Sequence, residues 1–505
     1  MCFSMKRHLP GPPEQISPRL QENLDYLAAK LGLGKSIDML QKDMVVGGKK
    51  AALVYVDGLT NGEVVALILQ KLSELKREDL CPDPLQQLLA KKIPYMEIEA
   101  EKSMPQAVTE LLSGQMLFFV DGEQAVILMD TRTYPARSPE EPETERLTRG
   151  SRDGFVETMM FNVALTRRRV RDPGLRVEGF RLGRRSKTDV ALMYIDGVTS
   201  PRLVDDLKRR LQAIDVDGLP MAEKSVEEFI TASRFNVFPL VRYTERPDVA
   251  ATHLLEGHVL IFVDTSPAVM IVPVTLFHHL QHAEEYRQNI LSGIYVRWIR
   301  FLAVMMSVIL APLYLLVSLE PSLLPQALRF IGPKEVGNIP LFLQFIIVHF
   351  GIDIIRIAGI HTPSPLATAL SLIAALLIGQ IAIDVGIFTP EVLLYGGLVA
   401  VGMFATPSWE LSQANRLVHL FLLLVTGLFR LPGFLAGIAL VLLRLATNKS
   451  FGVPYLWPIF PPDYAGLFSV LVRQPLPVEG RRPRALEPQD EDRVAAEGED
   501  SQGKE

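Results

Sequence analysis

Hydrophobic and polar positions divide the chain into two parts of different character. Up to about residue 300, short apolar runs alternate with polar and charged stretches, as in a soluble globular protein. From Phe301 to Leu443, Leu, Ile, Val, Phe, Ala and Gly dominate. Uncharged segments of about 20 residues can cross a hydrocarbon core of about 30 Å as helices. The pattern predicts a soluble front part followed by an α-helical transmembrane bundle.

The front part contains the same pattern twice. "ALVYVDGLT" begins at Ala52 and "ALMYIDGVT" at Ala191. A second pair follows in the same order, "LLSGQMLFFVDGEQAVILMDT" from Leu111 and "LLEGHVLIFVDTSPAVMIVPVT" from Leu254. Two matched pairs at nearly constant separation indicate an internal duplication, which outweighs local propensity as evidence for architecture.

Each copy combines strands and helices. An apolar run ends at Asp-Gly and is followed by an amphipathic helix, "NGEVVALILQKLSEL" in the first copy and "SPRLVDDLKRRLQAI" in the second. Two further apolar runs separated by a turn predict a β-hairpin. We therefore expect an α/β cytoplasmic domain of two duplicated subdomains. Its predicted parts are a flexible N-terminus (1–20), subdomain 1 (21–134), a Pro- and charge-rich linker (135–155) and subdomain 2 (156–290).

The predicted transmembrane domain covers 291–460. Its expected spans lie near 301–319, 366–388, 392–409 and 417–443. The apolar stretch 338–360 contains three ionisable side chains, so we expect it to be interfacial or re-entrant rather than spanning. The polar, charged segment 461–505 is expected to be a disordered cytoplasmic tail.

Basic residues flank the apolar region on both sides. Arg287, Arg297 and Arg300 precede it, and a group of Arg and Lys residues begins at Arg444. Such residues concentrate on the cytoplasmic side. Both ends are therefore expected to be cytoplasmic, with an even number of crossings. The first 15 residues contain no apolar signal segment, which agrees with this orientation.

Ionisable side chains within apolar segments are costly and mark an ion path, a relay or a buried pair. Gln380 and Asp384 are four residues apart and share one helical face. Two interpretations stay open: Asp384 and Arg430 line a water-filled passage, or Asp384 lies at headgroup level and Arg430 either pairs with it or extends to the membrane interface. The candidates are Asp353, Arg356, Gln380, Asp384 and Arg430.

Two further patterns have weaker implications. Gly433 and Gly437 have the spacing that lets helices approach closely in lipid. His278, His279 and His282 could place two imidazoles on one helical face, but no separate ligand set accompanies them. We favour a solvated helix next to the membrane there and predict no metal and no cofactor.

Composition excludes some functions. The formal net charge of −5 gives no basis for nucleic-acid binding. Two cysteines cannot provide a disulfide framework, as expected for a protein facing a reducing compartment. The chain has no Gly-rich phosphate loop, nucleophile elbow or paired-carboxylate motif. We therefore expect a protein that is not an enzyme.

Four stretches have a distinctive sequence: "RGSRDGFVETMMFNVALTRRRVRDPGLRVEGFRLGRRSKTDVALMYIDGV", "PLVRYTERPDVAATHLLEGHVLIFVDTSPAVMIVPVT", "SLIAALLIGQIAIDVGIFTP" and "SFGVPYLWPIFP". They resemble the A subunits of the GerA family of spore germination receptors. Other segments, including "LGKSIDMLQKDMVVGGKKAALVYVDG" and "LFHHLQHAEEYRQ", are more similar to the stage V sporulation protein AF branch of that family. The family pattern "REAG" reads "RIAG" here, with Ile357 in place of Glu, while Asp353 keeps a carboxylate one turn earlier.

The resemblance implies an integral protein of the spore inner membrane that assembles into an oligomeric ion channel. Membrane lipid, further copies of the chain and other sporulation or germination membrane proteins are the expected partners. Two alternatives stay open. One is an accessory component of dipicolinate or small-anion transport, with Arg430 as the partner of the anion. The other is a membrane scaffold that conducts nothing.

Overall fold

The computed structural model describes residues 15–93, 98–133, 145, 147–231, 235–332, 338–361, 381–475 and 480–493. The chain divides into two compact units. We call them the α/β unit, which contains residues 1–232, 243–273 and 480–505, and the helical unit, which contains residues 233–242 and 274–479. The division falls earlier than the expected end of subdomain 2 at 290. The reason is that Phe277 and Leu280 pack into the core of the helical unit with Leu411 and Val418.

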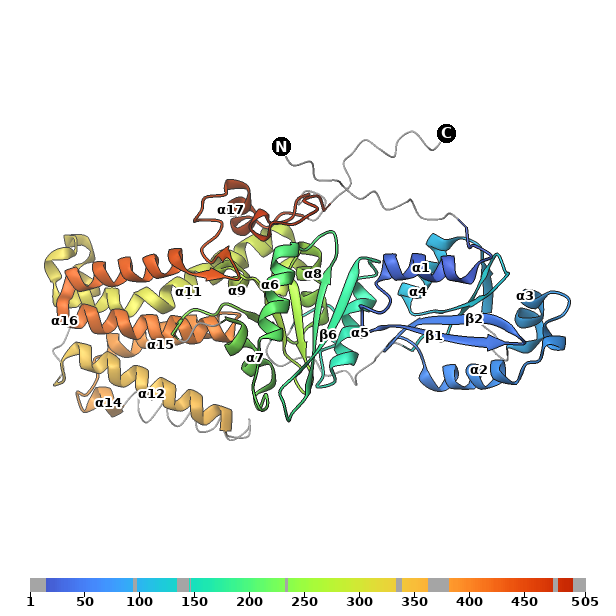
Figure 1. Ribbon diagram of the computed structural model, residues 1–505. Helices are drawn as coiled ribbons and strands as arrows, with labels where there is room; N and C mark the ends of the chain where they lie inside the picture. Colours follow the sequence, from blue (N-terminus) through green and yellow to red (C-terminus); the bar gives the residue numbers. More distant parts are fainter. Residues whose placement is uncertain are drawn as a thin grey trace. The chain divides into compact units, whose positions relative to one another are not determined.

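Subdomain 1 is a five-stranded antiparallel sheet with helices on both faces. The strand order is β1-β2-β4-β5-β3, and α1 and α4 lie on one face while α2 lies on the other (Figure 1). Side chains alternate between the two faces, so Phe119 joins the core under α1 and α4 and Phe118 joins the core under α2. The elements are α1 (Leu20–Leu31), β1 (Met39–Val46), β2 (Lys49–Val56), α2 (Gly62–Glu74), β3 (Ile98–Glu101), α4 (Met104–Ser113), β4 (Met116–Val120) and β5 (Val126–Met129).

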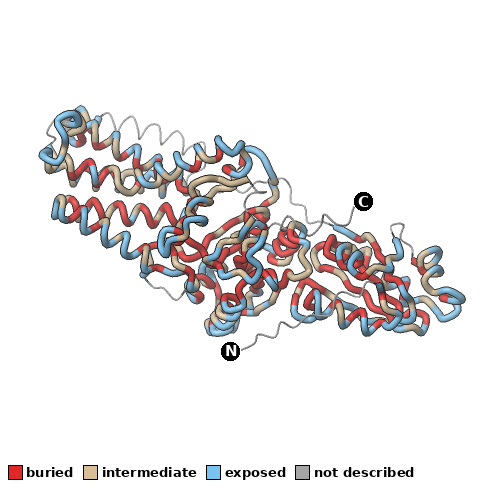
Figure 2. Tube along the Cα trace, turned by 90° about the horizontal axis from the view of Figure 1, so that it is seen from above, coloured by how far each residue is buried: buried red, intermediate tan, exposed pale blue. Residues whose placement is uncertain are grey.

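Subdomain 2 repeats this topology, which confirms the α/β fold with two duplicated subdomains. Its strand order is β6-β7-β9-β10-β8, and the pairs β6–β7, β7–β9 and β9–β10 are antiparallel. Most residues of the central strands of both sheets are buried. Buried residues run through the interior of the α/β unit (Figure 2). The elements are α5 (Met159–Arg169), β6 (Leu175–Leu182), β7 (Thr188–Ile195), α6 (Pro201–Gln212), α7 (Ala222–Thr231), β8 (Arg242–Thr244), α8 (Pro247–Glu256), β9 (Val259–Val263) and β10 (Val269–Val272).

Equivalent glycines end equivalent helices in the two subdomains. Gly114 closes α4 with φ 106° and Gly257 closes α8 with φ 103°, a left-handed conformation that glycine adopts without steric cost. A buried ion pair between Asp38 and Arg167 then joins subdomain 1 to α5 of subdomain 2. The two copies therefore form one body.

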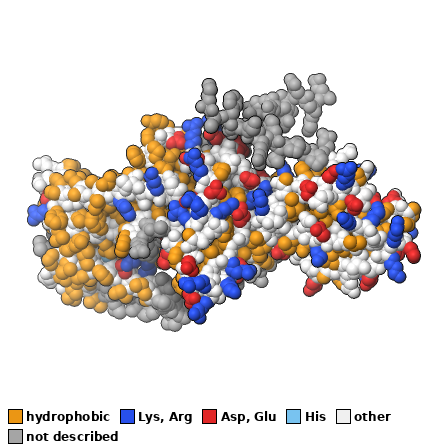
Figure 3. Space-filling view, in the orientation of Figure 1, with side chains coloured by type: hydrophobic (Ala, Val, Ile, Leu, Met, Phe, Trp, Pro, Cys, Tyr) orange, Lys and Arg blue, Asp and Glu red, His pale blue; other side chains and the backbone are white. Residues whose placement is uncertain are grey.

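Within its described residues, the helical unit contains three helices long and apolar enough to cross a membrane. They are α11 (Ile290–Leu319), the part of α12 (Leu341–His361) up to Ala358, and α16 (Trp409–Thr447). Hydrophobic side chains gather on the surface of this unit, whereas charged side chains are spread over the α/β unit (Figure 3). The other described α-helices and strands of this unit are shorter: α9 (Leu276–Leu280), α10 (Ala283–Arg287), α14 (Ile381–Asp384), α15 (Pro390–Phe404), β11 (Lys449–Ser450), β12 (Val453–Pro454) and α17 (Tyr464–Leu471).

The last apolar segment is not the single span expected at 417–443. Arg430 has φ 54° and ψ −135°, which interrupts α16. A Cβ added to Gly433 would lie 2.1 Å from the carbonyl oxygen of Val425, eight residues earlier, so the chain folds back on itself at this point. We call residues 409–429 and 431–447 the two limbs of α16. Pro432 explains the break, because proline lacks an amide hydrogen and clashes with the preceding helical turn.

The C-terminal segment also differs from the disorder that its composition predicts. Residues 480–493, here called the strap, form a closed loop in which Arg493 N–H donates to the carbonyl of Gly480 (2.8 Å). The strap belongs to the α/β unit, where Gln489 N–H donates to the carbonyl of Val198 (2.9 Å) and Leu486 is buried. Local hydrogen bonds and one buried leucine hold the strap in place despite its polar composition.

Candidate functional site: a polar ladder between two apolar helices

Three pairs of polar side chains link α12 to the first limb of α16. His349, Asp353 and Arg356 lie four and three residues apart on α12, so they share one face of that helix. Ser412, Arg416 and His419 have the matching spacing on α16. The two rows run in opposite directions. We call the pairs His349–His419, Asp353–Arg416 and Arg356–Ser412 the polar ladder.

The middle pair carries opposite charges. Arg416 forms an ion pair with Asp353, and their side chains are 22% and 14% exposed. Within an apolar segment, an isolated ion of either sign is strongly disfavoured, and a partner offsets much of that cost. The ion pair therefore explains how Asp353 is held within an apolar helix.

The two histidines stack at one end of the ladder. Their ring centroids are 4.4 Å apart, and both side chains are buried. The Nδ1–H of His349 donates to the carbonyl of Phe345 (2.8 Å), and that of His419 donates to the carbonyl of Val308 on α11 (3.1 Å). Among the described residues, neither Nε2 atom has a hydrogen-bond partner. Each Nε2 atom could therefore accept a hydrogen bond from a water molecule or bind a proton.

Arg356 stands at the other end. Its guanidinium lies 4.6 Å from the ring centroid of Trp409 and 5.3 Å from that of Phe404, and one of its nitrogens is 3.5 Å from Ser412 Oγ. Cation–π contacts of this kind stabilise a cation that is partly removed from water. The ladder thus contains two guanidinium groups and one carboxylate.

The other predicted site residues lie elsewhere. Asp384 is exposed at the end of α14, and Gln380 falls outside the described residues. Arg430 is exposed at the turn between the limbs of α16, not near the middle of a span. Gly433 and Gly437 are buried and pack against the first limb of the same chain.

Sequence reasoning missed Ser412, Arg416 and His419. The expected span starts at 417, which leaves Arg416 outside it, whereas α16 begins at Trp409. The signal that could have found them is the repeat of polar residues at i, i+4 and i+7, present on both helices.

The histidines before α11 do not form a common site. His278 Nδ1 accepts a hydrogen bond from the N–H of Thr275 (3.0 Å), and His282 Nδ1 accepts one from the N–H of Glu284 (3.2 Å). His279 Nδ1 lies 3.0 Å from Ser408 Oγ. His278 and His279 are buried, so this stretch is not the solvated helix that its polar sequence suggests.

The basic residues before the first span are also structural. Arg297 and Arg300 both pair with the buried carboxylate of Glu285. Arg297 Nη1 also donates to the carbonyls of Ser469 and Val470 at the end of α17 (both 2.9 Å). These contacts fix α10, α11 and α17 to one another.

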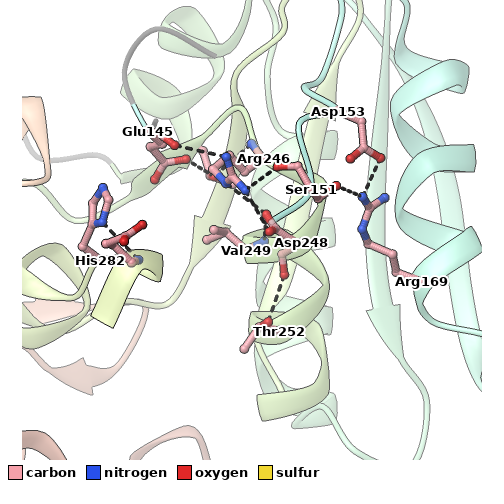
Figure 4. A network of polar contacts seen from close by, with 11 residues as sticks. Glu145, Ser151, Asp153, Arg169, Arg246, Asp248, Val249, Thr252 and His282 are labelled. Carbon is pink, nitrogen blue, oxygen red and sulfur yellow. Dashed lines mark hydrogen bonds and ion pairs between the residues drawn. The ribbon is translucent and has the colours of Figure 1, made fainter. Parts of the chain in front are cut away.

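A second polar cluster, centred on the buried Arg246, lies in the α/β unit (Figure 4). The guanidinium of Arg246 is fully buried and donates to Asp248 (3.1 and 2.9 Å) and to the carbonyl of Ser151 (3.0 Å). Arg169 pairs with Asp153 and donates to Ser151 Oγ (2.8 Å). Each arginine has a carboxylate partner, so this cluster fastens the segment before α5 to the start of α8.

The chain combines an α/β unit of two duplicated subdomains with apolar helices that carry a polar ladder. This combination is that of a membrane protein with a large domain outside the membrane. A family model for the Bacillus/Clostridium GerA spore germination protein matches residues 26–485. The chain belongs to the GerA family and is a membrane protein of spore germination or sporulation.

Curated relatives match over nearly the whole chain. Stage V sporulation protein AF of Bacillus subtilis (strain 168) is 44% identical over 467 residues, which are 92% of this chain and 95% of the relative. Spore germination protein B1 of the same organism is 31% identical over 485 residues, 94% of this chain and 99% of the relative. The crystal structure of the N-terminal domain of the A subunit of the Bacillus megaterium spore germinant receptor GerK3 is 30% identical. It covers 51% of this chain and 96% of that one, with a TM-score of 0.41.

Proposed function

We propose that this chain is a subunit of an oligomeric ion channel of the spore inner membrane that acts in spore germination. The observation that carries the proposal is the polar ladder, because it sets two arginines, an aspartate and two histidines within apolar helices. Ionisable groups at membrane depth are rare and by default functional. Several copies of the chain would enclose the water that an ion needs at this depth.

The exposed apolar face of α12 is the surface that a neighbouring copy would cover in the proposed assembly. Phe350, Ile354 and Ile357 are 62%, 64% and 56% exposed, and they flank the polar residues of the same helix. In a lone copy these side chains would face lipid close to a charged row. A neighbouring copy would cover them and shelter the ladder from the hydrocarbon.

The two ends of the chain support a cytoplasmic placement of the α/β unit. This unit contains residues before α11 and the strap after α17. Both ends of the membrane domain must then lie on one side of the membrane, in agreement with the basic residues around the apolar region. In this proposal α12 crosses the membrane, as its length permits, and is not interfacial.

Ion flux from proteoliposomes tests the proposal. The purified chain, reconstituted at known copy number, is expected to release K⁺, and Asp353→Asn is expected to change the rate at least several-fold. The same carboxylate-to-amide change in the exposed Asp215–Arg184 pair of the α/β unit is the matched control and should leave the rate unchanged. A double variant, Asp353→Asn with Arg416→Gln, should be less damaged than the single one, because no charge is left unpaired.

Three outcomes would contradict it. Wild-type protein that conducts in no oligomeric state favours the scaffold. A single copy in the purified assembly removes the shelter that the ladder needs. Normal flux in Asp353→Asn together with altered flux in Asp384→Asn would mean that ions pass near Asp384 and not along the polar ladder.

The excess positive charge of the ladder favours a second candidate, transport of a small anion such as dipicolinate. Two guanidinium groups face one carboxylate, so Arg356 could bind an anionic group. Arg356→Gln should then abolish dipicolinate uptake while K⁺ release persists. Arg430→Ala makes the same comparison at the turn of α16.

A further inference from the structure

Two histidines and a glutamate meet in the α/β unit, at the corner between α8 and β9. His253 lies in the last turn of α8, Glu256 ends that helix, and His258 directly precedes β9. One ring nitrogen of each histidine and one carboxylate oxygen lie within 4.8 Å of one another. Neither the polar ladder nor the cluster around Arg246 includes these three residues.

The local fold explains why they meet. His253 and Glu256 are three residues apart and share a face of α8. Gly257 then reverses the chain at φ 103°, and the N–H of His258 donates to the carbonyl of His253 (3.1 Å). The reversal returns His258 to the end of the helix, outside any helical spacing that a sequence search would test.

Both imidazoles are oriented by backbone carbonyls. The Nδ1–H of His253 donates to the carbonyl of Val249 (2.9 Å), and the Nδ1–H of His258 donates to the carbonyl of Pro273 (2.7 Å). A carbonyl only accepts, so in each neutral ring the lone pair is on Nε2. Metal-binding histidines typically have this arrangement, in which the second nitrogen is tied to a carbonyl or carboxylate.

We propose that His253, Glu256 and His258 form a binding site for a divalent transition-metal ion, with Zn²⁺ the expected occupant. Two imidazole nitrogens and one carboxylate oxygen are a donor set that suits Zn²⁺ and leaves a fourth position for water or an anion. Bonds of about 2.0–2.1 Å at tetrahedral angles separate ligand atoms by about 3.4 Å. His258 Nε2 and Glu256 Oε2 are already 3.8 Å apart. The three ligand atoms lie within 4.8 Å of one another, so the side chains must draw together to bind the ion, and the partly exposed Glu256 has room to rotate.

The strap reaches the same carboxylate. Arg493 lies 3.7 Å from Glu256 Oε1, and Arg482 donates to the carbonyl of Leu255 (2.8 Å). A divalent ion bound to Glu256 repels the guanidinium of Arg493 and replaces it as the partner of the Glu256 carboxylate. Metal binding and the Arg493 contact therefore compete, so metal occupancy loosens the end of the strap.

Titration of the full-length chain tests the site. The detergent-solubilised protein is freed of its affinity tag, treated with a chelator, and titrated with Zn²⁺ by calorimetry and with Co²⁺ by visible absorption. One equivalent per chain is expected. Loss of a partner that only orients a ligand weakens metal binding by about 10–100-fold, so His253→Ala and Glu256→Gln should weaken it at least as much. Arg493→Ala should tighten it several-fold.

The control is His282→Ala, from the other group of histidines, which should keep the full equivalent. Loss of binding in His282→Ala, or no binding by the wild type, would overturn the proposal. Glu256→Gln keeps the size of the side chain, and its thermal midpoint without metal should equal that of the wild type. If His253→Ala fails to fold, Glu256→Gln and Arg493→Ala still decide the question.

Discussion

At the residue scale, a polar side chain in this protein is best understood through its partner. His279 shows this outside the membrane spans. Its ring is fully buried, and burial, helped by the positive charge of Arg242, lowers its pKa to about 3 from the ordinary value of 6.5. The folded chain therefore keeps His279 neutral where an unfolded chain would protonate it.

The sign of the pH effect follows. Below pH 6.5 the unfolded chain binds a proton at His279 that the folded chain does not, so stability falls as the pH drops from about 6.5 towards 3. The loss is about 1.4 kcal/mol for each pH unit, or about 2 kcal/mol at a pH of about 5. We expect the thermal midpoint in detergent to fall between a pH of about 7 and about 5, and His279→Gln to reduce this fall. His282→Gln, at a half-buried position, is the control, and an equal fall in His279→Gln would refute the assignment.

The sequence predicts the charged residues of the candidate site on α12 but not their partners on α16. Asp353 and Arg356 stand out because charges are rare in apolar stretches. Their partners on α16 could not be assigned, because hydropathy does not reveal which helices touch. Asp384 and Arg430 have the same signal in sequence, yet both are exposed. A charge in an apolar segment therefore identifies a special position without saying whether it is paired.

At the element scale, α16 shows what periodicity cannot detect. Both limbs are apolar, so the mean hydropathy stays high across the turn and does not reveal it. At about 1.5 Å per residue, the first limb extends about 30 Å, long enough to cross a bilayer core alone. Pro432 and Gly433 carry the signal for the turn in sequence. The β-hairpins of both subdomains, in contrast, were predicted correctly from apolar runs and their turns.

The close approach of the two limbs makes a prediction about Gly433. A methyl group there would lie 2.1 Å from the carbonyl oxygen of Val425, so Gly433→Ala forces the limbs apart. Overpacking of this kind costs about 1–3 kcal/mol. The thermal midpoint of the purified chain should fall. Gly397→Ala in α15 is the matched control, because nothing lies within 4 Å of its added methyl, and an equal fall in both variants would contradict the hairpin.

At the scale of the whole molecule, the duplication could be predicted because the two subdomains share similar sequence stretches in the same order. The strap was not, because its polar composition resembles that of a disordered tail. Its attachment depends on contacts with residues near 198 and 255, far away in sequence. Long-range contacts of this kind leave no local pattern.

Leu486 provides a test of the strap. It is 3% exposed, so Leu486→Asp buries an unpaired charge and should release the segment. Trypsin should then cut after Arg481 and Arg484 much faster than in the wild type, as followed by mass spectrometry. Leu67→Asp, at a position 61% exposed on α2, should leave the cleavage rate unchanged. Equal rates in the wild type and Leu486→Asp would mean that the strap is not held in solution.

The strap follows the membrane domain along the chain, so it leaves the ribosome after the apolar helices. Domains generally fold as units during synthesis, the N-terminal ones first. The α/β unit must therefore fold without the strap while the apolar helices are still being made and inserted. Its final contacts form only when translation has passed the whole membrane domain, so a chain that stalls or is truncated before residue 480 keeps a bare surface next to Val198 and Leu255.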